Sequence, residues 1–329
     1  MKNEEKKING EKEMEVEISE RYVNPYTDFG FKKLFGSELN KDLLISLLNA
    51  LFHDKPEITD LTYMNTEHLG EGIVDRKAVF DVYCQLTDGS RIIVEMQKAE
   101  QQYFKDRSIY YSTYPIRERL RVGELCSGMQ GQKGEWNYRL KDVYTVGILN
   151  FTFPDGEYPD DSMIHEIKLK DVADNHVFYD KLTFVYLEMP KFNKKEEELE
   201  TMFDKWMFAL SNLARLLERP KALQERIFTR LFEQAEIAHF TPVEREQYVA
   251  SKKEYWDYYS TMETSFNKGK VEGHAEGLAE GMEKGHAEGK AEGLAEGKLE
   301  IARNLKQMNL SVQDIIKATG LTADEIEAL

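Results

Sequence analysis

Two acidic side chains, Asp81 and Glu95, stand on either side of a short turn in the segment AVFDVYCQLTDGSRIIVEMQK. The pair Asp88-Gly89 is a strong signal for a β-hairpin. If the loop has three residues and ends with Gly89 in the left-handed region, Asp81 lies directly opposite Glu95. Their Cβ atoms are then about 5 Å apart on one face. A two-residue loop would instead place the two carboxylates on opposite faces, so the pairing depends on the turn.

Gln97 lies two residues after Glu95 and therefore shares its face, because side chains alternate along a strand. Two neighbouring carboxylates repel each other unless a cation or a proton lies between them. Oxygen ligands of this kind suit Mg²⁺ or Mn²⁺. Such an ion can activate water for attack on a phosphate. Solvated acids on an edge strand are the alternative, and the pairing alone favours that alternative.

The opposite face of the same hairpin is apolar. It carries Phe80, Val82, Cys84, Leu86, Ile92, Val94 and Met96. This face is a nearly unbroken apolar surface.

The elements around the hairpin follow from hydrophobic periodicity. Helical spacing covers Asp28–Phe52 with a break near Gly36-Ser37, where Ser37 can cap a second helix. A further helix is expected over Phe104–Leu125, with Pro115 as a source of a kink. The expected strands are Ile58–Asn65, Lys77–Leu86, Arg91–Gln97, Val143–Phe153, Ile164–Leu169 and Thr183–Leu187, and everything after Glu196 reads as helical. The order α-β-β-β-α-β through residue 153 indicates an α/β domain with a mixed sheet.

Bulk composition narrows the class of protein. The 329 residues carry a net charge of −16, although residues 21–130 are nearly neutral with 14 Lys and Arg against 16 Asp and Glu. A local basic groove therefore remains compatible with the acidic whole. The only two cysteines, Cys84 and Cys126, exclude a disulfide framework and favour a reducing, cytoplasmic location. No apolar run predicts a membrane span or a secretory signal.

Three stretches in order resemble a known family. They are DFGFKKLF from Asp28, VEMQ from Val94 and YFKDRSIYY from Tyr103. Together they resemble the PD-(D/E)XK nuclease superfamily, and within it the recombination-promoting nucleases and putative transposases of the Rpn group. The resemblance covers roughly residues 21–190. It implies a restriction-endonuclease-like α/β core and a Mg²⁺- or Mn²⁺-dependent DNA endonuclease with a role in recombination or mobile elements.

The resemblance also implies roles for individual residues. Asp81 and Glu95 would bind the metal together with the backbone carbonyl of Met96. Gln97 occupies the position of the superfamily's usual lysine and would position water or a phosphate oxygen. Asp28 would reach the metal through water, although it could equally cap the helix that begins beside it.

Positive charge near the hairpin is expected from the neighbouring helices. Arg107 is predicted to lie nearest the scissile phosphate, with Lys105 and Lys32 as further contacts to DNA. The alternative to the nuclease hypothesis is a catalytically weak or inactive protein of the same fold that binds nucleic acid or directs assembly. Trp206, Phe203 and Phe208 are expected in the core of a packed helix.

The C-terminal part carries glycine at every fourth position from 269 to 297. Its other residues are strong helix formers, yet each interior glycine costs about 1 kcal/mol relative to alanine. The tract is therefore either a linker or a helix that packs against a partner, which makes homo-oligomerisation the functional hypothesis. The predicted division is a charged tail (1–20), the nuclease-like domain (21–195), a helical region (196–266), the glycine tract (267–300) and a helical hairpin (301–329).

Overall fold

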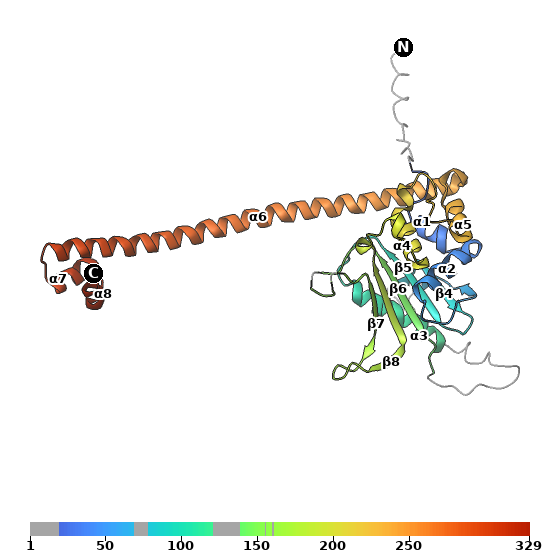
Figure 1. Cartoon of the computed structure of the whole chain (residues 1–329), viewed down its shortest axis with the longest axis horizontal. Coiled ribbons are helices and arrows are strands. Elements are labelled where there is room, and N and C mark those ends of the chain that lie inside the picture. Colours follow the sequence, from blue (N-terminus) through green and yellow to red (C-terminus); the bar gives the residue numbers. More distant parts are fainter. Residues whose placement is uncertain (1–19, 69–77, 121–138, 155, 160) are drawn as a thin grey trace, which may run out of the picture. The chain divides into compact units, whose positions relative to one another are not determined.

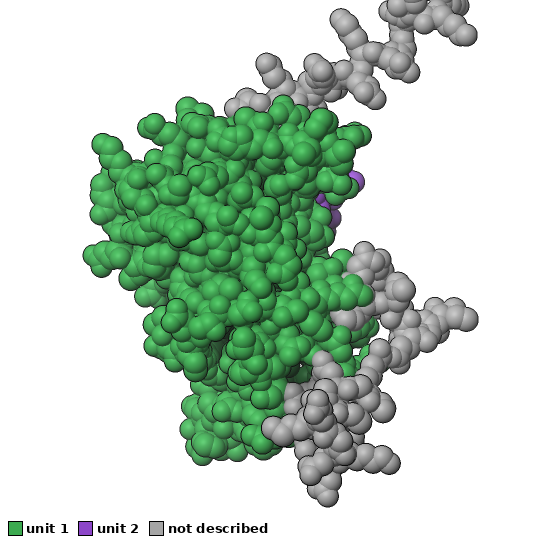
Figure 2. Space-filling model, turned by 90° about the vertical axis from the view of Figure 1, so that its right-hand side faces the viewer, with its two compact units in different colours: residues 1–256 green, residues 257–329 purple. Residues whose placement is uncertain are grey.

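The computed structural model describes residues 20–68, 78–120, 139–154, 156–159 and 161–329. The chain divides into two compact units, residues 1–256 and residues 257–329 (Figure 2). Residues 196–256 thus fall in the same unit as the nuclease-like core. The predicted loop glycines Gly70 and Gly72 and the residues Arg121, Cys126 and Ser127 lie outside the described residues.

The first unit is built on a six-stranded mixed sheet (Figure 1). Its strands, in spatial order, are β1 (Leu61–Tyr63), β4 (Val82–Leu86), β5 (Arg91–Gln97), β6 (Val143–Leu149), β8 (Val177–Glu188) and β7 (Ile164–Lys170). β1, β4 and β5 are antiparallel, β5, β6 and β8 are parallel, and β7 is an antiparallel edge strand. The mixed sheet expected from the sequence is confirmed. The carboxyl ends of β5, β6 and β8 meet at one edge.

The hairpin between β4 and β5 has the predicted three-residue loop. Gly89 adopts φ +87°, in the left-handed region, and the N–H of Leu86 binds the carbonyl of Ser90 at 2.9 Å. Val82 consequently pairs with Val94, which is the expected register. This register brings Asp81 opposite Glu95, one position beyond the last paired residue of β4.

The prediction of one continuous strand over Lys77–Leu86 is wrong, because the chain bends before Val82 and forms two separate strands. Its first part, β3 (Ala78–Val79), pairs with β2 (Glu67–His68) in a separate two-stranded sheet. Asp81 lies in the bend between β3 and β4.

The bend also corrects the predicted face of Phe80. Phe80 packs with Tyr83 and Ile93 rather than with Val82. Side-chain alternation stops at the bend, so a residue before it can face the other way.

Helices cover both faces of the sheet. On one face, Tyr111 and Tyr114 of α3 (Phe104–Leu120) pack against the cluster that contains Ile93. Pro115 lies inside α3, and the predicted end of this helix at Leu125 falls outside the described residues. The other face meets α1 (Asp28–Phe35), where the hydroxyl of Tyr63 donates to the carbonyl of Phe35 at 2.7 Å.

The predicted break after α1 is confirmed. A 3₁₀ turn (Glu38–Asn40) separates α1 from α2 (Lys41–Leu51). The expectation that the Ser37 side chain caps the second helix is wrong, because Ser37 makes no capping hydrogen bond. The chain changes direction here through the 3₁₀ turn instead.

Two further helices, α4 (Met202–Asn212) and α5 (Arg226–Ala235), complete the first unit. Trp206 of α4 is fully buried; its ring lies 5.9 Å from that of Phe35, and its indole N–H donates to Ser46 at 3.1 Å. Trp206 is therefore a core residue, as predicted, and it ties residues beyond 195 to the sheet domain.

The second unit contains most of α6 (Pro242–Gln307), followed by α7 (Val312–Thr319) and α8 (Ala323–Glu327). The glycine tract is helical throughout. Ala302, Ile315 and Ile326 form a small buried core where α7 and α8 fold back. No helix in the described part of the chain is long and apolar enough to cross a membrane.

Candidate active site

Asp81 and Glu95 are linked to each other through the backbone. Oδ2 of Asp81 accepts a hydrogen bond from the N–H of Met96 at 2.7 Å, and Oε1 of Glu95 accepts one from the N–H of Asp81 at 3.3 Å. Glu95 is buried with 8% exposure. The hairpin thus holds two carboxylates side by side at the carboxyl end of β5.

Both carboxyl groups have raised pKa values. Burial raises the pKa of Asp81 to about 6, against the opposing effect of the Met96 N–H. Burial and the neighbouring Asp81 charge also raise the pKa of Glu95 well above its usual range. Two ionised carboxylates here are therefore costly without a compensating cation.

Gln97 connects this pair to α3. Its Nε2 donates to Oε2 of Glu95 at 3.1 Å, and its Oε1 accepts a hydrogen bond from Nη2 of Arg107. The amide can serve as donor on one side and acceptor on the other. The Arg107 charge also lowers the pKa of Glu95, so Arg107 acts on the carboxylates directly as well as through Gln97.

Tyr111 is a site residue to which the sequence reading assigned no role. The guanidinium of Arg107 lies 5.7 Å from the centre of its ring. Burial raises the pKa of Tyr111, and the Glu95 charge raises it further, so the phenol lies near the carboxylates. The signal in the sequence is the spacing of four residues, which places Arg107 and Tyr111 on one face of a helix.

The first helix adds charge from the other side of the site. Asp28 forms an ion pair with Lys32 at 2.7 Å and is not the helix cap; that role belongs to Thr27, whose hydroxyl accepts from the N–H of Gly30 at 3.1 Å. The charge of Asp28 raises the pKa of Asp81, whereas the charge of Lys32 lowers it. Both side chains therefore lie within electrostatic reach of Asp81.

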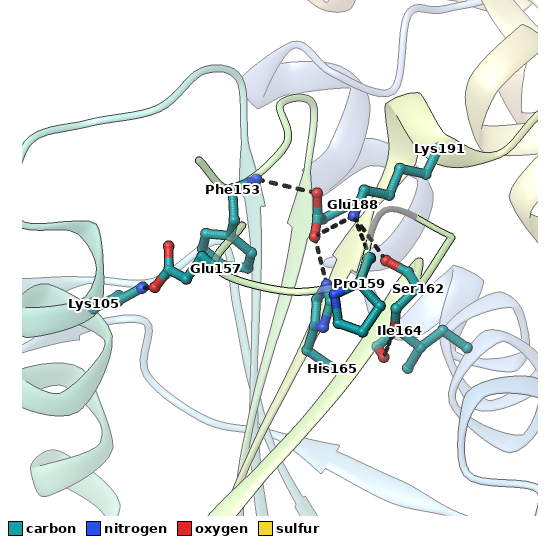
Figure 3. Close-up of polar contacts among 9 residues, drawn as sticks. All are labelled: Lys105, Phe153, Glu157, Pro159, Ser162, Ile164, His165, Glu188 and Lys191. Atoms are coloured by element: carbon teal, nitrogen blue, oxygen red, sulfur yellow. Dashed lines mark hydrogen bonds and ion pairs between the residues drawn. The ribbon is translucent and has the colours of Figure 1, made fainter. Parts of the chain in front are cut away.

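Lys105 does not join this group. Its ammonium pairs with Glu157 and lies 5.1 Å from the ring centre of Phe153 (Figure 3). It faces a cluster of aromatic residues beyond the start of α3. Of the three predicted basic residues, Arg107 and Lys32 converge on the carboxylates and Lys105 does not.

The donor set suits a hard divalent cation. No group of three or more His, Cys, Asp or Glu side chains in the described ranges is arranged to hold a metal ion. Magnesium, however, commonly takes only one or two carboxylates and completes its shell with water and substrate phosphate. The buried pair Asp81 and Glu95 fits that requirement, because burial is the main cause of their raised pKa values and a cation would compensate the two buried charges.

A second polar cluster surrounds Glu188 at the carboxyl end of β8 (Figure 3). Glu188 is fully buried; it contacts the ring of His165, accepts from the N–H of Phe153 at 3.1 Å and binds Lys191 at 3.2 Å. Lys191 also donates to the carbonyl of Ser162 at 3.0 Å. These partners satisfy the carboxylate and fasten the loop before β7 to the sheet, which is a structural role.

Comparison with known proteins identifies a related family. The family model described as PD-(D/E)XK nuclease family transposase matches residues 25–265. The match begins just before α1 and ends inside α6, so it includes α4 and α5 as well as the sheet. No curated protein and no solved structure matches the chain.

Proposed function

This chain belongs to the family of PD-(D/E)XK nuclease transposases, and from that premise we propose that it is a Mg²⁺- or Mn²⁺-dependent DNA endonuclease of the cytoplasm. The observation that carries the proposal is the buried pair Asp81 and Glu95, held together by the hairpin and raised in pKa. Recombination or the movement of a genetic element would be the setting for such cutting.

Asp81 and Glu95 would hold the metal with the backbone carbonyl of Met96. The N–H of Met96 points toward Asp81. The N–H and C=O of one strand residue face the same neighbouring strand, so the Met96 carbonyl is directed to the same side. A bound divalent ion supplies an activated water and stabilises negative charge on the phosphate. Asp28 would assist through water.

Arg107 would replace the cation that the superfamily's lysine supplies. Gln97 occupies the lysine position and carries no charge, but its Oε1 binds the Arg107 guanidinium. Arg107 is therefore placed to hold a phosphate oxygen, while the Gln97 amide fixes the orientation of Glu95. Lys32 adds positive charge from α1. This arrangement favours an active enzyme over the alternative of an inactive DNA-binding or assembly module.

The decisive experiment is cleavage of supercoiled plasmid by the full-length protein in Mg²⁺, beside Asp81→Ala. If the proposal is right, the parent protein gives nicked or linear plasmid in Mg²⁺, whereas Asp81→Ala gives no product and the parent protein gives none in EDTA. DNA binding without cleavage by the parent protein would instead support the inactive alternative.

We also propose that the glycine tract (267–300) mediates self-association. A Cβ added at Gly269, Gly281 or Gly297 meets no described atom within 4 Å. Eight interior glycines cost the helix about 1 kcal/mol each, so packing against a partner would help to stabilise it. A glycine every four residues drifts about 40° per repeat around the helix. A period above 3.6 favours right-handed winding with a second helix.

A further inference from the structure

A polar cleft of about 680 Å³ opens at the carboxyl edge of the sheet. Its floor includes Asn150, directly after β6, and Met189, directly after β8. In open α/β sheets, ligands bind in the crevice outside the carboxyl ends of the strands. Its volume lies within the range of small-ligand sites, roughly 300–1,000 Å³.

The cleft adjoins the candidate active site through two chain connections. The N–H of Asn150 donates to the carbonyl of Gln97 at 2.9 Å. Tyr26, which also lines the cleft, precedes Asp28 by two residues. Two residues of the lining thus lie next to residues of the candidate active site, one through a backbone hydrogen bond and one along the chain.

The lining offers the groups that recognise a nucleotide. Phe192 and Phe208 are half-buried, and neither ring contacts another aromatic ring in the described part of the chain. Phe208 is thus a cleft residue rather than a core residue, contrary to the expectation from the sequence. Bases stack on such rings whatever their sequence. Asn193 is exposed in the lining, and its amide can bond base edges.

Two cationic side chains in the lining are available to an anionic ligand. Arg215 and Lys195 line the cleft, are exposed and form no ion pair with a described residue, whereas Lys194 is paired with Asp204 at 2.7 Å.

We propose that this cleft binds one unpaired nucleotide of the DNA strand that is cut, with the base against Phe192 and the phosphate at Arg215. The inference rests on the proposed nuclease function and specifies its substrate. A base within an intact duplex must first be unstacked and unpaired, which costs a few kcal/mol. The enzyme therefore prefers DNA with single-stranded character beside the scissile phosphate.

Two acidic residues, Glu196 and Glu197, also line the cleft. Glu196 is committed to the N–H of Ala222 at 3.0 Å, while Glu197 is exposed. The hydrogen bond leaves the charge on Glu196, so the two carboxylates equal the exposed cations Arg215 and Lys195 in number.

The test measures binding of the full-length protein to a short labelled single-stranded oligonucleotide and to the matching blunt duplex, in EDTA so that no cleavage occurs. Phe192→Ala and Arg215→Gln should each weaken single-strand affinity about fivefold or more, with a smaller effect on the duplex. Arg215 is exposed, so its variant keeps the fold even if Phe192→Ala does not.

Matched controls lie outside the cleft. Phe178 is 79% exposed near the start of β8, and Arg226 is exposed at the start of α5. Phe178→Ala and Arg226→Gln should bind both probes as the parent protein does. Equal affinities for Arg215→Gln and Arg226→Gln, or no binding of the single strand by the parent protein, would overturn the proposal.

Further arms separate this inference from the nuclease proposal. Asp81→Ala should keep single-strand binding, because Asp81 lies outside the cleft. If the parent protein cleaves plasmid but the cleft variants bind the single strand unchanged, only the cleft proposal is refuted. If the cleft variants lose single-strand binding but the parent protein cleaves no plasmid, only the nuclease proposal is refuted. Displacement of the strand by an equal concentration of a free deoxynucleoside monophosphate would show that the cleft takes a free nucleotide, which contradicts the proposal.

Discussion

The carboxylate of Glu95 accepts a hydrogen bond from the backbone N–H of Asp81 at 3.3 Å, across the hairpin that joins β4 and β5. The bond exists because Asp81 lies in the bend before β4, where its N–H is turned toward β5. The second acid thus holds the first in place. This arrangement means that either side chain can be changed to its amide without removing the backbone support.

Asp81→Asn and Glu95→Gln should each abolish plasmid cleavage in Mg²⁺ while the melting temperature in EDTA stays equal or rises. The amide oxygen can still accept the hydrogen bond from the backbone N–H of Met96 in Asp81→Asn, or from that of Asp81 in Glu95→Gln, and either change removes the repulsion between two buried charges. In Glu95→Gln, the bond from Gln97 Nε2 is lost unless the Gln97 amide turns over. Cleavage assays and thermal melts on the same preparations check both parts. Asp106→Asn, at an exposed position on α3, is the matched control and should remain active. Full cleavage activity in Asp81→Asn or Glu95→Gln would contradict the assignment of that residue to the active site.

The stability of the metal-free protein should fall as pH rises through the pKa of Asp81. The folded pKa is about 6 and lies above the unfolded value of about 3.9. The folded state therefore binds more protons between these values, and the contribution is present below about pH 4 and lost above about pH 6. Other carboxylates titrate as well, so the comparison is with Asp81→Asn.

In EDTA, the melting temperature of Asp81→Asn minus that of the parent protein should increase between about pH 4 and pH 7. Added Mg²⁺ should reduce this difference at the higher pH, because metal binding needs ionised carboxylates. A difference that does not change with pH would contradict a raised pKa.

Arg107→Gln should lower the cleavage rate by about tenfold to a hundredfold, the value of one charge-assisted hydrogen bond of 1.5–3 kcal/mol. The guanidinium binds Gln97 and lies over Tyr111, so its loss removes positive charge beside Glu95. Steady-state rates at saturating DNA isolate this effect from binding. Lys105→Gln is the control, since Lys105 pairs with Glu157, and it should change the rate far less. Equal losses of cleavage rate in Arg107→Gln and Lys105→Gln would contradict a role for Arg107 at the scissile phosphate.

Gly30→Ala should destabilise the first unit by about 1–3 kcal/mol or more. A Cβ at Gly30 would lie 2.1 Å from the carbonyl oxygen of Asn24 and 2.7 Å from the Thr27 hydroxyl, so the start of α1 must shift. Denaturant unfolding measures the change. The same substitution at Gly281, where no described atom lies within 4 Å, should stabilise its helix by about 1 kcal/mol. Tolerance of Gly30→Ala would show that this entry to α1 is not tightly constrained.

Truncation after Phe266 should convert the protein to a monomer if the glycine tract mediates self-association. The first compact unit ends at residue 256, so this truncation retains it whole. Light scattering of the full chain and the truncated protein at micromolar concentration gives the molar masses. Two monomers would show that the tract does not associate. Plasmid cleavage by the truncated protein provides a check that the fold survives.

The sequence by itself determined the parts of the site that depend on local geometry. The sequence located the hairpin at Asp88-Gly89 and limited it to two loop lengths, of which the structure has the three-residue loop with Gly89 at positive φ. Period-two alternation then places Gln97 beside Glu95. The break after α1 and the family motifs were likewise readable, since each lies within a short stretch of chain.

Tertiary structure alone decided which distant groups reach those carboxylates. Lys105 and Arg107 differ by two positions on one helix, yet only Arg107 faces Gln97, because the packing of α3 on the sheet sets which side of the helix points inward. The cleft beside Asn150 joins segments from five parts of the chain, none of which signals a site alone. Periodicity predicts which face of an element is buried, whereas the partner of that face follows from how the elements pack.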